Sequence, residues 1–219
     1  MEYQVKVWDL PTRVFHWTLV AAVCFMWLSA EIGGSWMAWH LRCGLLILGL
    51  LVFRLCWGIW GSDTARFSQF VRSPAQIKRY LCGEISENEQ LGHNPLGALM
   101  VVALIGAVLF QVFTGLFAAD DNTWLYNGYL SGLISEHAAI VARRVHMVFF
   151  NFLAILIVVH IAAVMFYKKM KGRDLITPMI TGVKSVFEQR PTFYFAGVGR
   201  FAAAFALALA VVLLVVKIG

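Results

Sequence analysis

The sequence predicts an all-α integral membrane protein, and two observations support this fold class. Of its 219 residues, 60% are hydrophobic and only 14% are charged, whereas soluble domains carry about a quarter charged residues. Five apolar stretches also reach the length that an α-helix needs to cross a bilayer. The expected architecture is a four-helix transmembrane bundle that is extended by a fifth, C-terminal transmembrane helix. We expect a membrane partner and no nucleic-acid partner.

The five predicted spans divide the chain into two parts. They cover Val14–Glu31, Trp36–Trp60, Pro95–Ala118, Val145–Tyr167 and Phe201–Val216. A loop of about 34 residues with amphipathic character separates the second span from the third. Residues 1–185 are predicted to form the four-helix domain, and residues 186–219 a polar connection and the additional helix. The fifth span carries no polar group suited to chemistry.

The distribution of Lys and Arg predicts the orientation of the chain. With the N-terminus inside, fourteen of the 18 basic residues lie on the inner side. The outer side carries four, namely Arg42, Arg143, Arg144 and Lys217. Because Lys and Arg are enriched in cytoplasmic loops, this asymmetry predicts a cytoplasmic N-terminus and a C-terminus on the outer side of the membrane.

Four histidines fall into two pairs at different membrane depths. His146 and His160 are fourteen residues apart, which is four helical turns and about 21 Å along the axis of the fourth span. His16 begins the first span near the inner side, and His40 begins the second span near the outer side. Depth alone therefore pairs His16 with His160 and His40 with His146.

This pairing predicts two haems stacked across the membrane. Two imidazoles fill both axial positions of a haem iron, which leaves a centre that carries single electrons. The sequence contains no CxxCH motif, so the haems are expected to be b-type and not covalently attached. The alternative is that the histidines are ordinary polar residues of a helix bundle, but ionisable groups within a membrane are costly and usually functional.

Arginines near the same membrane boundaries are candidates for binding the haem propionates. Arg13 precedes His16 by three residues, and Arg54 lies near the inner end of the second span. Arg is suited to carboxylates because its guanidinium forms paired, charge-assisted hydrogen bonds. The alternative, which also applies to Arg42, is that these side chains extend to the lipid headgroups.

A polar turn just before the third span is a candidate quinone site. It has the sequence Gly92-His93-Asn94-Pro95 and is expected on the cytoplasmic side, close to the inner haem. His93 or Asn94 would hydrogen-bond a carbonyl of ubiquinone or menaquinone, and one of them would pass a proton. The alternative is that Asn94 caps the helix that Pro95 begins.

Several segments resemble the bacterial dihaem cytochrome b family, which includes the cytochrome b561 proteins and the cytochrome b subunits of nickel–iron hydrogenases and some formate dehydrogenases. The segments are Val7–Trp17, Arg54–Gly58, Gly61–Phe67, Gly92–Gly97, the histidine pair at fourteen-residue spacing, and Met179–Lys184. The resemblance covers nearly the first 185 residues. It implies haem ligands at His16, His40, His146 and His160, and electron exchange between the quinone pool and an outside partner.

Three functions compete at this point. The leading one is an electron-transfer subunit of an oxidoreductase complex, whose partner is a periplasmic c-type cytochrome, a hydrogenase or another dehydrogenase. The second is a self-sufficient superoxide:quinone oxidoreductase, which would need a cationic funnel that Asp120, Asp121 and Glu136 oppose. The third is a proton or metal transporter that uses the histidines as a relay and carries no haem.

Overall fold

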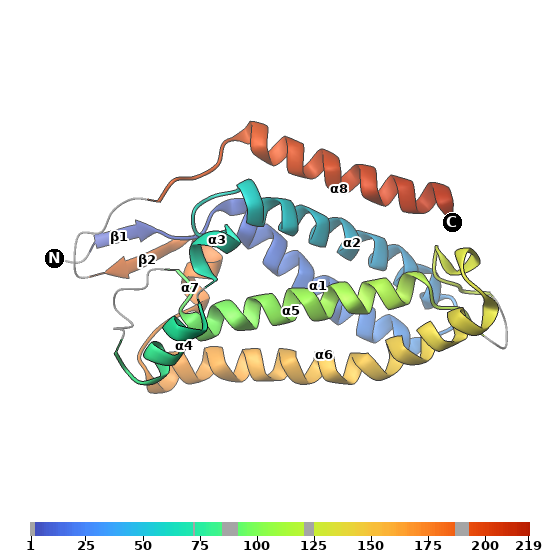
Figure 1. Cartoon of the computed structure of the whole chain (residues 1–219), viewed down its shortest axis with the longest axis horizontal. Helices are drawn as coiled ribbons and strands as arrows, with labels where there is room; N and C mark the ends of the chain where they lie inside the picture. The colour runs from blue at the N-terminus through green and yellow to red at the C-terminus, as the bar shows by residue number, and fades with distance from the viewer. Residues whose placement is uncertain (1–2, 72, 85–91, 121–124, 187–192) are drawn as a thin grey trace. The chain divides into compact units, whose positions relative to one another are not determined.

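The computed structural model describes residues 3–71, 73–84, 92–120, 125–186 and 193–219, and its main elements are long helices (Figure 1). Five of them are long and apolar enough to cross a membrane. They are α1 (Leu10–Ile32), α2 (Trp36–Trp60), α5 (Pro95–Leu116), α6 (Glu136–Met170) and α8 (Val198–Ile218). The predicted all-α membrane fold with five spans is therefore confirmed.

Helix α6 is much longer than the span predicted within it. The prediction began at Val145, whereas the helix begins at Glu136 and runs for 35 residues. Hydropathy could not indicate this start because the first turns carry charged residues. The start is set instead by Ser135, whose hydroxyl accepts a hydrogen bond from the N–H of Ala138 at 3.3 Å.

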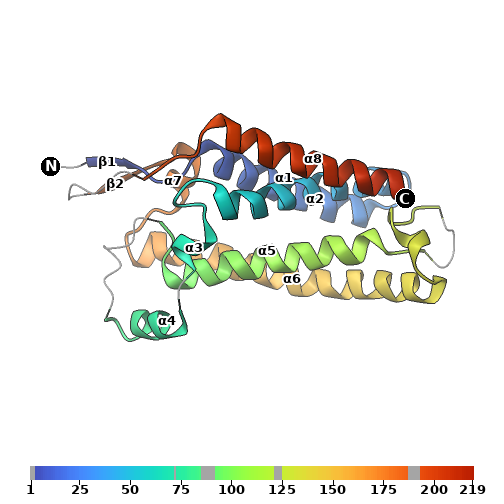
Figure 2. The same cartoon turned by 45° about the horizontal axis from the view of Figure 1, so that its top comes forward.

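The connections between the spans contain short elements. The amphipathic loop after α2 forms α3 (Phe67–Phe70) and α4 (Pro74–Leu81), and η2 (Ser131–Leu133) precedes α6. After α6 come α7 (Ile176–Thr181) and β2 (Val183–Val186). Strand β2 pairs antiparallel with β1 (Tyr3–Lys6), as both cartoon views show (Figure 2). This small sheet was not predicted, since its pairing joins segments that are distant in the sequence.

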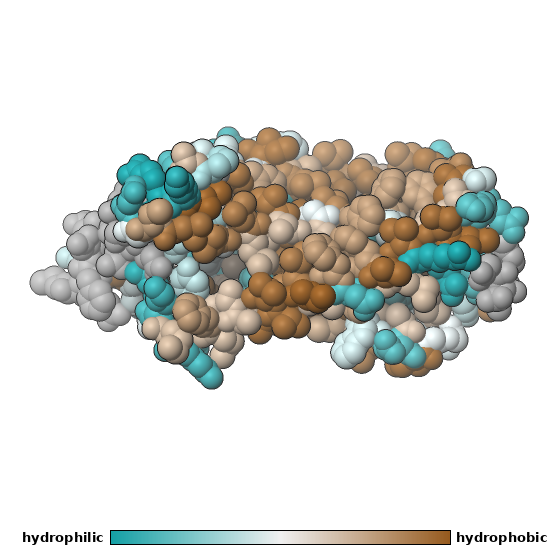
Figure 3. Space-filling model, turned by 60° about the horizontal axis from the view of Figure 1, so that its bottom comes forward, coloured by the Kyte–Doolittle hydropathy of each residue, from teal (hydrophilic) through white to brown (hydrophobic). Residues whose placement is uncertain are grey.

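The chain divides into two compact units, which are described separately below. The connector unit consists of Met1–Phe15, Arg54–Ala103 and Val158–Ala202, and the histidine-pair unit of His16–Phe53, Leu104–Ile157 and Ala203–Gly219. Large apolar side chains are exposed along the helices of both units, and Figure 3 shows them as extensive brown areas. Such exposure is expected of helices that face lipid rather than water.

Candidate functional site: a histidine pair and its surroundings

His40 and His146 face each other in the histidine-pair unit. The centres of their rings are 6.3 Å apart, and the ring planes are inclined at 82°. An imidazole nitrogen binds a metal at about 2.0–2.1 Å, so two imidazoles on one metal have their ring centres about 6.2–6.4 Å apart. The observed separation therefore matches two axial ligands of one iron.

The Nδ1 atom of His40 is held by helix α1. It lies 3.1 Å from the carbonyl oxygen of Met26 and 3.1 Å from the hydroxyl of Ser29. That hydroxyl is completely buried and donates to the same Met26 carbonyl at 3.0 Å. Because a carbonyl oxygen only accepts hydrogen bonds, Nδ1 of His40 carries the proton, and Nε2 is left with a free lone pair.

The Nδ1 atom of His146 is held in the same way by helix α5. It donates to the carbonyl oxygen of Gln111 at 2.8 Å, and the hydroxyl of Thr114 lies 3.3 Å away. The Thr114 hydroxyl donates to the Gln111 carbonyl at 3.0 Å. Each histidine thus meets a helical carbonyl and the hydroxyl of the residue three positions further on, which leaves Nε2 as the acceptor nitrogen of each ring. In His146 the amide nitrogen of Gln111 lies 3.3 Å from this atom.

The residues around the pair therefore fit a haem iron. Ligating histidines usually donate their second ring nitrogen to a carbonyl or carboxylate, which fixes their orientation. Gly115 also leaves room for the ring, since a Cβ at this position would lie 2.8 Å from Cε1 of His146. The described residues contain no group of three or more His, Cys, Asp or Glu side chains that could hold a bare metal ion. Haem iron needs only two protein ligands.

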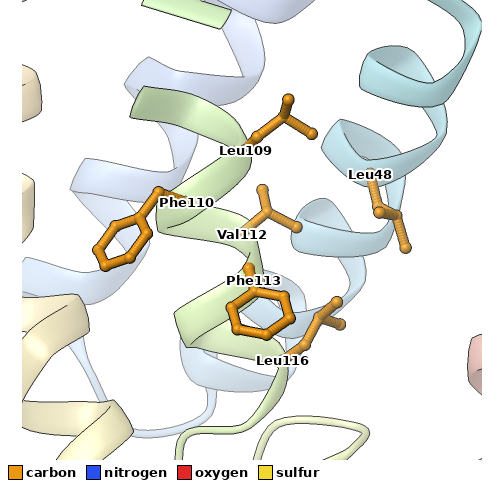
Figure 4. A pocket seen from close by; sticks show the side chains of 6 residues that line it. All are labelled: Leu48, Leu109, Phe110, Val112, Phe113 and Leu116. Atoms are coloured by element: carbon orange, nitrogen blue, oxygen red, sulfur yellow. The ribbon is translucent and has the colours of Figure 1, made fainter. Parts of the chain in front are cut away.

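An apolar cavity of about 370 Å³ lies elsewhere in the same unit. Figure 4 shows Leu48 of α2 opposite side chains of α5. Its lining consists of Leu48, Leu109, Phe110, Val112, Phe113 and Leu116. The cavity is suited to hydrocarbon and offers no group for chemistry.

In the connector unit, the buried carboxylate of Asp9 joins three segments. Asp9 caps α1 by accepting from the N–H of Thr12 at 2.9 Å. Its other oxygen accepts from Nε1 of Trp57 at 2.8 Å and from the hydroxyl of Ser62 at 2.5 Å. Gly182, in the left-handed region at φ 86°, provides the carbonyl that accepts from the N–H of Val7 at 2.8 Å. Four of the segments that carried the family resemblance thus meet here, namely Val7–Trp17, Arg54–Gly58, Gly61–Phe67 and Met179–Lys184.

The two candidate propionate ligands both lie in this unit. Arg54 is 3% exposed, donates to the carbonyl oxygen of Ala65 at 3.1 Å, and lies 4.8 Å from the ring centre of Phe67. Arg13 donates to the carbonyl oxygen of Ile180. Its Nε is buried and has no hydrogen-bond partner within the described part of the chain. These bonds engage some of the five donors on each guanidinium.

His93 is enclosed by aromatic rings. The ring centres of Trp8 and Phe70 each lie 4.6 Å from that of His93. Burial, together with the positive charge of Arg54, lowers the pKa of His93 to about 3. Its Nδ1 is buried and finds no hydrogen-bond partner among the described residues. His93 is therefore a neutral imidazole with an unused nitrogen.

Asn94, in contrast, is fully engaged in the fold. Its side-chain oxygen accepts from the N–H of Gly97 at 2.6 Å and so caps α5. Its amide nitrogen donates to the hydroxyls of Tyr80 and Tyr167 at 3.1 and 2.9 Å. The capping alternative thus accounts for every polar group of this side chain.

The predicted inner pair is divided between the units. His16 lies in the histidine-pair unit, where its ring packs on Trp17, and His160 lies on α6 in the connector unit. Their pairing stays a prediction. His137, expected in the outer loop, lies in the first turn of α6 and is exposed.

Sequence reasoning missed Met26, Ser29, Gln111 and Thr114. A carbonyl such as that of Met26 leaves no signal in the sequence. A signal was present for Ser29, Gln111 and Thr114, because polar side chains are uncommon within apolar spans.

Multi-pass helices and a pair of facing imidazoles, each oriented by a carbonyl, are typical of membrane proteins of the cytochrome b type. The family model of prokaryotic cytochrome b561 matches residues 7–182. The chain therefore belongs to the prokaryotic cytochrome b561 family, whose members are membrane cytochromes that bind haem b. No match was found among curated proteins or solved structures.

Proposed function

We propose that the chain carries electrons across the bacterial inner membrane between the quinone pool and a redox partner, through two b-type haems. The observation that carries this proposal is the His40–His146 pair, with ring centres 6.3 Å apart and both Nδ1 atoms directed to carbonyls. A haem bound between two imidazoles accepts and releases single electrons and leaves no position for oxygen. The Lys and Arg distribution supports a cytoplasmic N-terminus and a periplasmic C-terminus.

The second haem is assigned to His16 and His160 on the depth argument from the sequence. Arg13 and Arg54 are proposed to bind propionates, since each keeps N–H donors beyond its bond to a backbone carbonyl. The partner is proposed to be a periplasmic c-type cytochrome, a hydrogenase or another dehydrogenase, so that the chain acts as an electron-transfer subunit.

The ligand assignment predicts two groups of variants. Wild-type protein should contain two haems per chain by pyridine haemochrome assay. His40→Ala and His146→Ala should each remove one redox component, and His16→Ala and His160→Ala should each remove the other. His137→Ala is the matched control, because this exposed histidine lies on the same helix as two ligands. A wild-type content near zero or one would disprove the proposal, and similar behaviour of His16→Ala and His146→Ala would disprove the pairing.

Quinone is proposed to bind through His93. A neutral imidazole with an unused nitrogen can donate a hydrogen bond to a quinone carbonyl, but a pKa of about 3 makes it a poor proton acceptor near neutral pH. His93 is therefore poorly suited to the proton transfer expected at this turn. Asn94 is less suited than His93 to bind the quinone carbonyl, because its polar groups already bind Gly97, Tyr80 and Tyr167.

His93→Phe should keep the aromatic packing and both haems while slowing haem reduction by a quinol. Stopped-flow absorbance would measure this rate, with dithionite reduction as the control for intact haems. Unchanged quinol kinetics would place the quinone elsewhere, for example near the His40–His146 pair. Loss of a haem would make His93 part of a haem site instead.

The competing functions receive less support. A superoxide-oxidising enzyme would use Arg143 in its outer funnel, but this side chain lies 3.6 Å from Asp120, which offsets its charge. Asp121, which also opposes such a funnel, lies outside the described residues. Membership of a cytochrome family disfavours a haem-free transporter, and a visible spectrum with a haem Soret band would exclude it.

A further inference from the structure

Helix α5 carries an unexpected amide beside the histidine pair. Gln111 and Thr114 are the two polar side chains in the 22 residues of this helix. The neighbours of Gln111 in sequence, Phe110 and Val112, line the apolar cavity (Figure 4). A buried amide lowers stability unless its hydrogen bonds are satisfied, so its presence in an apolar span calls for a reason.

Gln111 and His146 are joined by two hydrogen bonds in opposite directions. Nδ1 of His146 donates to the backbone carbonyl of Gln111 at 2.8 Å, and the side-chain amide of Gln111 donates to the backbone carbonyl of His146 at 3.0 Å. The second bond fixes which end of the amide faces the histidine, because an amide oxygen in that position would repel the carbonyl oxygen.

The same amide nitrogen lies 3.3 Å from Nε2 of His146, the nitrogen that remains for a metal. The other end of the amide, Oε1, is buried and lacks a hydrogen-bond partner within the described part of the chain. The amide is therefore oriented with its positive end toward the ligand nitrogen. In a low-dielectric site such a dipole disfavours additional positive charge nearby.

We propose that Gln111 is a positioning residue that raises the reduction potential of the centre between His40 and His146. The inference rests on the proposed function, which places a haem iron between these two histidines. Oxidised iron carries one more positive charge than reduced iron, so the N–H end of the amide stabilises the reduced form relative to the oxidised form. Hydrogen bonding around axial ligands is one of the means by which proteins adjust haem potentials.

The test is a redox titration of the full-length purified protein, monitored in the haem absorption bands. Gln111→Met keeps the length of the side chain and removes the amide. It should shift the midpoint of one haem to lower potential by a threefold to tenfold change in the reduction equilibrium, where tenfold corresponds to about 59 mV. The other haem should not change. Gln111→Asn keeps an amide on a shorter side chain and should shift the same haem less.

Gln76→Met is the matched control, because Gln76 is exposed on α4 in the connector unit. It should leave both midpoints unchanged. A Gln111→Met protein with full haem content and unchanged midpoints would overturn the inference. Haem loss in Gln111→Met or Gln111→Asn would also overturn the inference if the haem that remains keeps its wild-type midpoint. Gln111 would then have only a structural role. Absence of haem from the wild-type histidine pair would instead refute the proposed function.

Discussion

The two units use their polar side chains for different purposes. In the connector unit, residues of the family-like segments hold backbone segments together, as Asp9 does by binding Thr12, Trp57 and Ser62. In the histidine-pair unit, polar residues outside those segments orient His40 and His146, as Ser29 and Thr114 do. The segments that resemble the family thus hold the connector unit together, while the groups that orient the paired histidines lie in ordinary apolar spans.

The largest expected effect comes from removing the carboxylate that joins the connector unit. Asp9→Ala leaves Nε1 of Trp57 and the hydroxyl of Ser62 without their acceptor, and removes the negative charge near buried Arg54. Breaking a buried charged network of this kind costs about 3–5 kcal/mol. We expect a large fall in folded yield and in thermal stability in detergent.

The control for Asp9→Ala is Glu84→Ala. It breaks the exposed ion pair with Arg79, whose atoms are 3.1 Å apart, and exposed pairs contribute about 0–1 kcal/mol. Equal stability of the two variants would show that Asp9 does not hold the connector unit together. It would contradict the structural role given to the polar side chains of this unit.

A smaller and more local effect is expected in the histidine-pair unit. Gly115→Ala places a Cβ 2.8 Å from Cε1 of His146, so the ring must move from its position opposite His40. We expect partial loss of one haem, measured by pyridine haemochrome assay, in a protein that remains folded. Gly106→Ala on the same helix is the control, because nothing lies within 4 Å of a Cβ there. Equal haem loss in both variants would show that helix α5 tolerates no added methyl group anywhere.

The smallest effect is expected at the cap of α5. Asn94→Ala removes the acceptor for the N–H of Gly97 and should lower stability by about 1 kcal/mol. Thermal unfolding monitored by circular dichroism would measure the change, and both haems should be retained. Slowed quinol kinetics in this variant, with an unchanged melting temperature, would return Asn94 to the quinone site.

The spans could be predicted because a segment that crosses lipid must form a long apolar helix, and the hydropathy of the sequence identifies such segments directly. The start of α6 could not, because Glu136 and its neighbours are polar and the helix there depends on the capping residue Ser135. The β1–β2 sheet depends on tertiary pairing of two four-residue strands, which local pattern does not reveal.

In the candidate site, too, features of a single helix could be predicted and features that depend on a neighbouring helix could not. The spacing of His146 and His160 is a property of one helix and could be read from the sequence. The pairing of His40 with His146 on one haem was inferred from depth and stays a prediction; the structure places the two ring centres 6.3 Å apart. Ser29 and Thr114 could not be assigned in advance, because a buried hydroxyl in an apolar helix has many possible acceptors until the neighbouring helix is known.

The way in which the His40–His146 pair is assembled has a consequence for biogenesis. The two histidines are 106 residues apart in the chain, and the groups that orient them lie on α1 and α5. On the proposed function, four helices must therefore be synthesised and inserted before this pair can bind a haem. The groups that orient the two rings all belong to the chain itself. Helix α8 provides none of these groups, so on the proposed function haem can bind at this pair before α8 is inserted.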